Sequence, residues 1–143
     1  AGMVLLHENE SKIYGCRPEG VKDLFATLGC ENFQGIFDPG NFACEDIASY
    51  DEAWTQGLAE LTVYFHIKDK RTGDVACCPA GDGKGQIEQV LADAHRRGFT
   101  GYLTVEPHMK AAGQFSGFTG PDLFAKAVEG LRKVCQKAGM PLK

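Results

Sequence analysis

A repeating order of segments constrains this chain more than any other feature of its sequence. Four times, a short apolar run is followed by a polar loop and then by a segment with apolar residues at helical spacing. The runs are VLLHE, FQGIFDPG, LTVYFHIKD and GYLTVEPH, at residues 4–8, 33–40, 61–69 and 101–108. Because no hairpin signal joins one run to the next, the pattern predicts parallel strands connected by right-handed helical crossovers. The predicted fold class is therefore α/β.

The predicted helices follow these strands at residues 18–29, 51–61, 85–98 and 121–139. Three of them have a regular apolar stripe. The stripes are Val21, Leu24, Phe25 and Leu28; Ile87, Val90, Leu91 and Ala94; and Phe124, Ala127, Val128, Leu131 and Val134. At 143 residues the chain has the length of one domain, and we predict that residues 1–143 form a single domain.

Charge and composition argue against nucleic acid and membranes as binding partners. The net charge is -4, and basic residues form neither a run nor a stripe with aromatic ones, so we expect no binding to nucleic acid. We also expect no membrane association, because no apolar stretch approaches about eighteen residues, and a cytoplasmic location, because a signal peptide is not recognisable. The six cysteines form no CxxC pair or regular framework, so we expect reduced, mostly buried thiols.

Alternation of side chains along the strands predicts that four ionisable residues share one face of the sheet. These residues are Glu8, Asp38, His66 and Glu106, each at the C-terminal end of its strand. The opposite face is almost purely apolar in three of the four strands, as expected for a side covered by helices, and His7 is the exception in the first strand. Ligands bind at the C-terminal edge of parallel sheets, in open sheets and barrels alike.

Three carboxylates and one imidazole at this edge predict a site for one divalent cation. Carboxylates brought together repel one another, and a cation removes that repulsion. The ligand set suits Mn, Mg or Co, with Zn as a further candidate. Taken singly, Glu8 and Glu106 could be solvated strand-end acids, Asp38 could organise an Asp-Pro-Gly turn, and His66 could be an interior histidine. Their coincidence on four consecutive strands favours the metal site.

Five motifs in order carry a resemblance to a known family. They are HENE followed by IYG, FDPGN, FHIKD, PAGDGKGQI, and EPH followed by GQFSGFTGP. Together they resemble the C-terminal half of the sugar phosphate isomerase/epimerase family, the xylose-isomerase-like TIM barrels. The resemblance implies strands five to eight of a (β/α)8 barrel, with Glu8, Asp38, His66 and Glu106 holding one divalent metal ion.

The same resemblance implies a reaction. Members of the family isomerise or epimerise sugars, sugar phosphates or related polyols by proton exchange next to a carbonyl, and some relatives use a hydride shift instead. Glu8 and Glu106 would be the catalytic acid/base pair. Two other functions remain open: an incomplete half-barrel that binds metal or a partner chain without turnover, and a metal-dependent hydrolase like endonuclease IV. The hydrolase would need a multi-zinc cluster with more histidines than the four in this chain, and a basic face.

Four further residues are candidates for substrate binding: Asn41, Lys68, Arg71 and His108. Three of them also have a structural interpretation, with Asn41 as a loop cap and Lys68 and Arg71 as water-exposed charges, while His108 could belong to a lid. The long loop GQFSGFTGP, with Phe115 and Phe118, is a candidate lid. The Gly-rich segment 79–85 lacks the spacing of a nucleotide-binding loop. We expect His7, Asn9 and Glu10 to support the site or lie in a loop.

Four strands make half a barrel, so one face of the sheet should remain uncovered. Helices on one side would leave an apolar face uncovered, which soluble monomers avoid. The residues expected on this face are Val4, Leu6, Ile36, Tyr64 and Tyr102. We therefore predict that the chain is either part of a longer chain with a missing N-terminal half, or that two copies associate to close the barrel around a small carbohydrate substrate.

Overall fold

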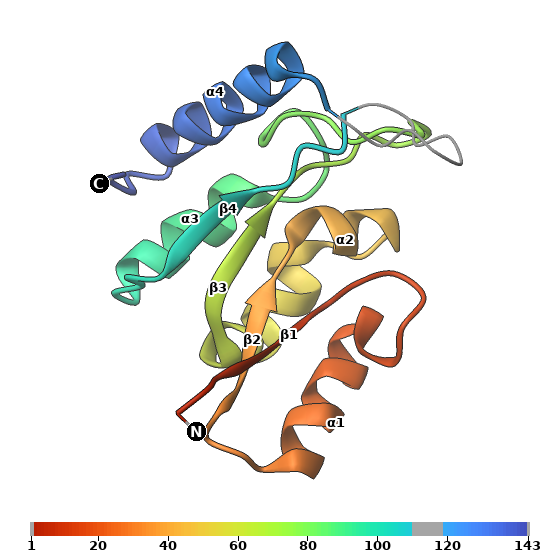
Figure 1. The fold of residues 1–143 in the computed structure, drawn as a ribbon, viewed down its shortest axis with the longest axis vertical. Helices are drawn as coiled ribbons and strands as arrows, with labels where there is room; N and C mark the ends of the chain where they lie inside the picture. The colour runs from red at the N-terminus through yellow and green to blue at the C-terminus, as the bar shows by residue number, and fades with distance from the viewer. Residues whose placement is uncertain (1, 110–118, 143) are drawn as a thin grey trace.

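The structure is a computed structural model that describes residues 2–109 and 119–142. Its centre is a single four-stranded parallel sheet with the strand order β1-β2-β3-β4 (Figure 1). The strands are β1 (Leu5–Glu8), β2 (Phe33–Phe37), β3 (Thr62–Ile67) and β4 (Tyr102–Val105). All four lie within the predicted apolar runs, and the parallel order confirms the predicted α/β class.

Four α-helices connect or follow the strands. They are α1 (Pro18–Leu28), α2 (Pro39–Cys44), α3 (Ile87–Arg96) and α4 (Pro121–Lys137). Prolines begin α1, α2 and α4, where a missing N–H costs no helical hydrogen bond. Gly29 ends α1 in the left-handed conformation, and its N–H donates to the Phe25 carbonyl oxygen. Three helices therefore begin and end close to the predicted residues.

The second predicted helix, at residues 51–61, is wrong. This region instead holds the irregular short helices η2 (Ser49–Ala53), η3 (Trp54–Gln56) and η4 (Ala59–Leu61), while η1 (Tyr14–Cys16) lies before α1. Gly57 adopts φ 107 between η3 and η4, and this left-handed residue interrupts any continuous helix. The regular helix of this unit is α2, in the stretch that we expected to be a loop.

The hydrophobic core lies between one face of the sheet and the helices. Phe37 and Phe65 project from β2 and β3 and both contact Trp54, with ring centroids 5.2 and 5.6 Å from the indole. The predicted stripe of α3 is confirmed, because all four of its residues are buried. Two other stripes are overestimated, since Leu28 and Phe124 are each 48% exposed. Leu28 is the last residue of α1, and Phe124 lies near the start of α4.

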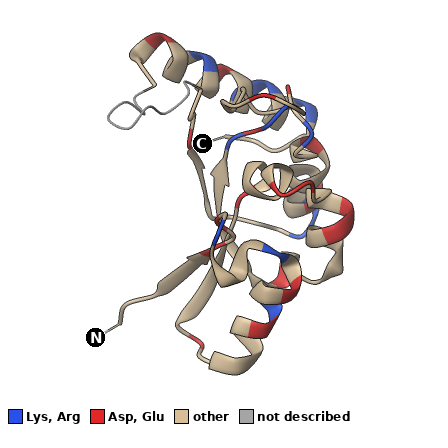
Figure 2. Ribbon diagram, turned by 90° about the vertical axis from the view of Figure 1, so that its right-hand side faces the viewer, with Lys and Arg blue, Asp and Glu red and all other residues tan. Residues whose placement is uncertain are grey.

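The opposite face of the sheet carries no helix among the described residues. In Figure 2 the strands lie to one side and helices α1 to α3 to the other, and the charged residues gather on the helices and loops. The predicted uncovered residues include Val4, Leu6 and Tyr102, which are 51%, 40% and 75% exposed. Leu5, expected on the helix-covered face, is also 61% exposed, because it lies at the start of the outermost strand.

All six cysteines are free thiols, as predicted, but the expectation that most are buried is wrong. Only Cys78 and Cys135 are buried, while Cys30 and Cys44 are exposed because each lies at or just beyond the end of a helix. Within residues 2–109 and 119–142, no helix combines the length and apolar character needed to cross a bilayer. Phe115 and Phe118 of the candidate lid lie outside the described residues.

Candidate metal centre

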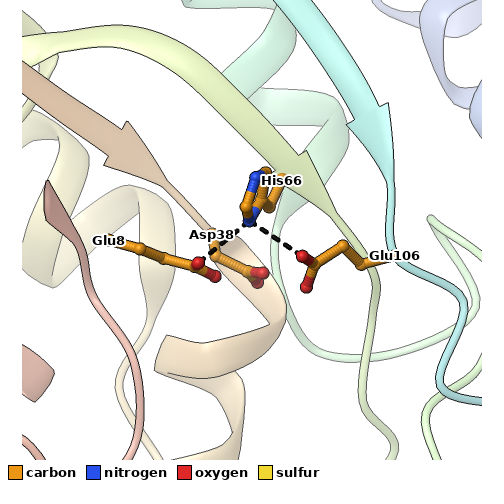
Figure 3. A group of neighbouring side chains, drawn as sticks. All are labelled: Glu8, Asp38, His66 and Glu106. Carbon is orange, nitrogen blue, oxygen red and sulfur yellow. Dashed lines mark ion pairs between the residues drawn. The ribbon is translucent and has the colours of Figure 1, made fainter. Parts of the chain in front are cut away.

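Four side chains meet at the C-terminal edge of the sheet. Glu8 and His66 lie at the ends of β1 and β3, and Asp38 and Glu106 directly follow β2 and β4. One ligand atom from each residue lies within 4.8 Å of the other three. Figure 3 shows Glu8 and Glu106 reaching inward from opposite sides towards His66, with Asp38 between them. The parallel register of adjacent strands produces this convergence, because it brings all four strand ends to one edge.

The His66 imidazole has the environment of a metal ligand. Its Nδ1 atom lies 3.0 Å from Glu8 Oε2 and 3.0 Å from Glu106 Oε1 (Figure 3). Neither contact has hydrogen-bond geometry, and the buried Nδ1 has no hydrogen-bond partner among the described residues. A buried polar atom without a partner is costly, and a cation between this nitrogen and the two carboxylates would satisfy all three groups. The residues therefore fit one divalent ion.

Asp38 is held rigidly by its surroundings. It is fully buried and forms the N-cap of α2, where its Oδ1 accepts a hydrogen bond from the Asn41 N–H at 2.9 Å. The Asn9 side chain, also buried, donates to the Asp38 carbonyl at 2.9 Å and accepts from its N–H at 2.8 Å. Burial raises the pKa of the Asp38 carboxyl to about 7, although the Lys68 ammonium lowers it. Asp38 thus both caps α2 and contributes a carboxylate to the cluster.

Lys68 is part of the acidic cluster rather than a water-exposed charge. Its side chain is 6% exposed, and its Nζ donates to Asp38 Oδ2 and, at 2.7 Å, to Glu106 Oε2. Burial lowers the pKa of Lys68, but its pairs with these carboxylates outweigh this effect and raise the pKa overall. For Glu106, burial raises the pKa, but the hydrogen bond from Lys68 and the charge of Lys68, with smaller contributions from His66 and His108, together outweigh burial and lower the pKa overall. Lys68 is therefore a charged ammonium.

The other candidate substrate residues lie at different distances from the cluster. Asn41 is buried beside it, and its Nδ2 donates to Glu8 Oε1 at 3.0 Å. His108 is 61% exposed, with Nε2 3.6 Å from Glu106 Oε2. Arg71 lies on the loop after β3, where it pairs with Asp82 at 3.1 Å and Asp74 at 3.8 Å. The structure thus brings Asn41, Lys68 and His108 to the acids, whereas the ion pairs of Arg71 lie within its own loop.

Sequence reasoning missed the role of Asp69. Its carboxylate is buried and accepts hydrogen bonds from the N–H groups of Lys70, Gly81, Gly83 and Gly85. A Cβ at Gly83 would lie 2.3 Å from Asp69 Oδ1, so this glycine allows the loop to close around the acid. The signal in the sequence was the alternation of glycines in 79–85. This loop, expected to lack a nucleotide-binding role, folds around a side chain of the protein itself.

A protein-family model supports the interpretation reached from the geometry. The model described as "Xylose isomerase-like TIM barrel" matches residues 1–134. The chain belongs to this family. None of the curated protein sequences compared with it is significantly similar. The family match confirms the resemblance found in the sequence motifs.

Solved structures with the same fold are about twice as long. A xylose isomerase domain protein from Alicyclobacillus acidocaldarius has a TM-score of 0.61 at 20% identity, with 85% of this chain and 44% of that chain covered. A D-tagatose 3-epimerase-like protein has a TM-score of 0.68 at 17% identity, covering 96% of this chain and 49% of the other. A D-psicose 3-epimerase, solved in the presence of D-fructose, has a TM-score of 0.63 at 17% identity, covering 96% and 50%. These similarities establish the fold, and the chain spans about half the length of these xylose isomerase-like structures.

Proposed function

We propose that this chain, in a completed barrel, forms the metal-binding part of an isomerase or epimerase that acts on a sugar, a sugar phosphate or a related polyol. The observation that carries the proposal is the convergence of Glu8, Asp38, His66 and Glu106, with a buried imidazole nitrogen to which the described part of the chain offers no hydrogen-bond partner. The family match supports it, as do the names of two similar structures, a D-tagatose 3-epimerase-like protein and a D-psicose 3-epimerase.

All four residues would hold one divalent ion, with Mn, Mg and Co favoured by the three carboxylates and Zn as a further candidate. A bound ion would supply electrostatic stabilisation of negative charge on substrate oxygens. In this role Asp38 and His66 have a purely ligating function. Asn9 holds the backbone of Asp38 through its hydrogen bonds, and Asn41 donates to the carboxylates of Asp38 and Glu8 through its N–H and its Nδ2.

Glu8 and Glu106 would be the acid/base pair. They come from the two outer strands of the sheet and approach the centre from opposite sides (Figure 3). A substrate carbon between them can lose a proton to one carboxylate and receive a proton from the other, which inverts its configuration. His108 lies beside Glu106 and remains exposed, so it is available to bind a substrate hydroxyl group.

Proton exchange in heavy water tests this function. The chain, loaded with Mn(II), would be incubated with ketoses and inositol-type substrates, and substrate C–H exchange would be followed by NMR. Glu8→Ala and Glu106→Ala should each lower exchange by about a hundredfold or more, as expected for loss of a general acid or base. Glu10→Ala is the matched control, because Glu10 is exposed and its carboxylate accepts from the neighbouring Ser11 N–H.

Two outcomes would point elsewhere. An equal loss of exchange in Glu10→Ala would mean that Glu8 is the wrong choice of acid in the HENE segment. Mn(II) bound with no C–H exchange would favour the incomplete half-barrel that binds metal or a partner chain. A multi-zinc hydrolase is disfavoured by the ligand cluster in the described residues, which contains only one histidine.

A further inference from the structure

Lys68 interacts with the same three acids that form the candidate metal centre. Its Nζ donates to Asp38 and Glu106 and lies 3.8 Å from Glu8 Oε1. A lysine that is 6% exposed has lost most of its hydration, so these carboxylates must replace the water. Lys68 is therefore an internal cation of the cluster.

The two outer acids present different oxygens to the lysine and to the imidazole. Glu8 Oε2 and Glu106 Oε1 face His66 Nδ1, each at 3.0 Å. The other oxygen of each carboxylate faces Lys68, at 3.8 Å for Glu8 and 2.7 Å for Glu106. For these two acids, an ion beside His66 would thus use one set of oxygens while Lys68 keeps the other. At Glu8 and Glu106 the lysine need not leave for the metal to bind.

The backbone around Gly40 makes room for this lysine. A Cβ at Gly40 would lie 2.6 Å from Lys68 Cγ and 2.7 Å from the Lys68 carbonyl oxygen. The start of α2 and the end of β3 therefore pack too closely for any side chain at residue 40. The same α2 segment positions Asp38, so the ion pair between Lys68 and Asp38 is part of how this edge of the sheet is assembled.

We propose that Lys68 is a built-in counter-charge that matches the centre to one divalent ion. With a divalent ion bound, all three carboxylates would be ionised, and together with the one ammonium they would carry two net negative charges, which the ion neutralises. Lys68 also limits repulsion among the acids when no ion is bound. The inference rests on the proposed metal site and assigns Lys68 a charge-setting, positioning role in place of the substrate contact suggested by sequence.

Comparing ions of different charge tests this role. Removing one positive charge favours a bound ion in proportion to the charge of that ion, whereas any loss of rigidity affects all ions alike. In Lys68→Met, affinity for Tb(III) should therefore rise relative to affinity for Mn(II) by at least about tenfold, measured by calorimetry on the whole chain. The metal-induced rise in melting temperature should also be larger in Lys68→Met than in the wild type.

Lys68→Gln repeats the test with a side chain that retains a polar head, in case Lys68→Met does not fold. Lys133→Met is the matched control, because Lys133 is 68% exposed on α4 and pairs with Glu129. An unchanged ratio of Tb(III) to Mn(II) affinity in the folded variant would overturn the role of Lys68. A wild-type chain that binds no Mn(II) would instead overturn the metal site itself, so the two failures are distinguishable.

Discussion

The two faces of the sheet differ in what covers them. On one face, Phe37 and Phe65 are 1% and 0% exposed and pack against Trp54 beneath the helices. On the other face, Leu6 is 40% exposed and Tyr102 75% exposed, with no helix above them among the described residues (Figure 2). One half of a barrel can thus build a packed core between sheet and helices, but it cannot cover the interior face on which its own site lies.

The largest expected effect concerns the open face. When the 143-residue chain is produced by itself, it should associate through this face, and light scattering should give a mass of at least twice 15.5 kDa. The double variant Leu6→Glu/Tyr102→Glu should return the mass to one copy. A dissociation constant of about 1 μM corresponds to a binding free energy of about 8 kcal/mol. Burying two charged side chains in the interface would offset this binding free energy.

Val75→Glu is the control for this experiment. Val75 is 84% exposed on the loop after β3, outside the sheet, so its substitution should leave the mass unchanged. A stable monomer of the unsubstituted chain would contradict the idea that the open face needs a cover. In a longer chain that contains eight such strands, by contrast, the other four strands should cover the equivalent face, so that two copies do not associate through it.

Neighbouring residues on β3 provide a direct comparison of the two faces. Phe65→Ala should lower the free energy of unfolding by about 3–5 kcal/mol, because it leaves a cavity under the helices. Tyr64→Ala, on the open face, should cost about 1 kcal/mol through lost contact with Tyr102, whose ring centroid is 5.9 Å away. Urea denaturation measures both values. Equal losses of unfolding free energy in the two variants would mean that the open face is also packed against other residues in the folded protein.

An effect smaller than that of Phe65→Ala is expected at the outer edge of the covered layer. Asp93 accepts a hydrogen bond from the buried Trp54 indole at 2.7 Å and pairs with Arg97 at 2.6 Å. Burial raises the pKa of Asp93, but these partners outweigh it and lower the pKa overall. The ionised carboxylate therefore stabilises the fold at pH values above its unfolded pKa of about 4, and this contribution is lost as the pH falls through the lower, folded value.

Asp93→Asn should accordingly reduce the free energy of unfolding by about 1–2 kcal/mol at pH 7 and by little at acidic pH. Urea denaturation between pH 7 and 3 checks the prediction. Glu60→Gln is the control, since Glu60 is 61% exposed and pairs only with Arg97 among the described residues. If the wild type and Asp93→Asn differ in free energy of unfolding by the same amount across this pH range, the role of the ionised Asp93 carboxylate is contradicted.

The strands and the ligand residues were predictable because both depend on short-range periodicity. Alternation along a strand decides the face of each side chain, and parallel order brings the strand ends to one edge. This reasoning is sufficient to bring Glu8, Asp38, His66 and Glu106 together. The short irregular helices at 49–61 were not predictable in the same way, because the packing of Trp54 and the left-handed Gly57 favour them over the continuous helix that the apolar spacing predicted.

The sequence by itself determined the four strands, three of the helices, the parallel class and the four residues that converge at the strand ends. Only the tertiary structure decided that Lys68 turns into the acidic cluster, that Asn9 holds the Asp38 backbone and that Asp69 organises the glycine loop. Each of these side chains lies at or beyond a strand end, where periodicity no longer dictates direction. There the burial of a charge and the hydrogen bonds that compensate it select the conformation.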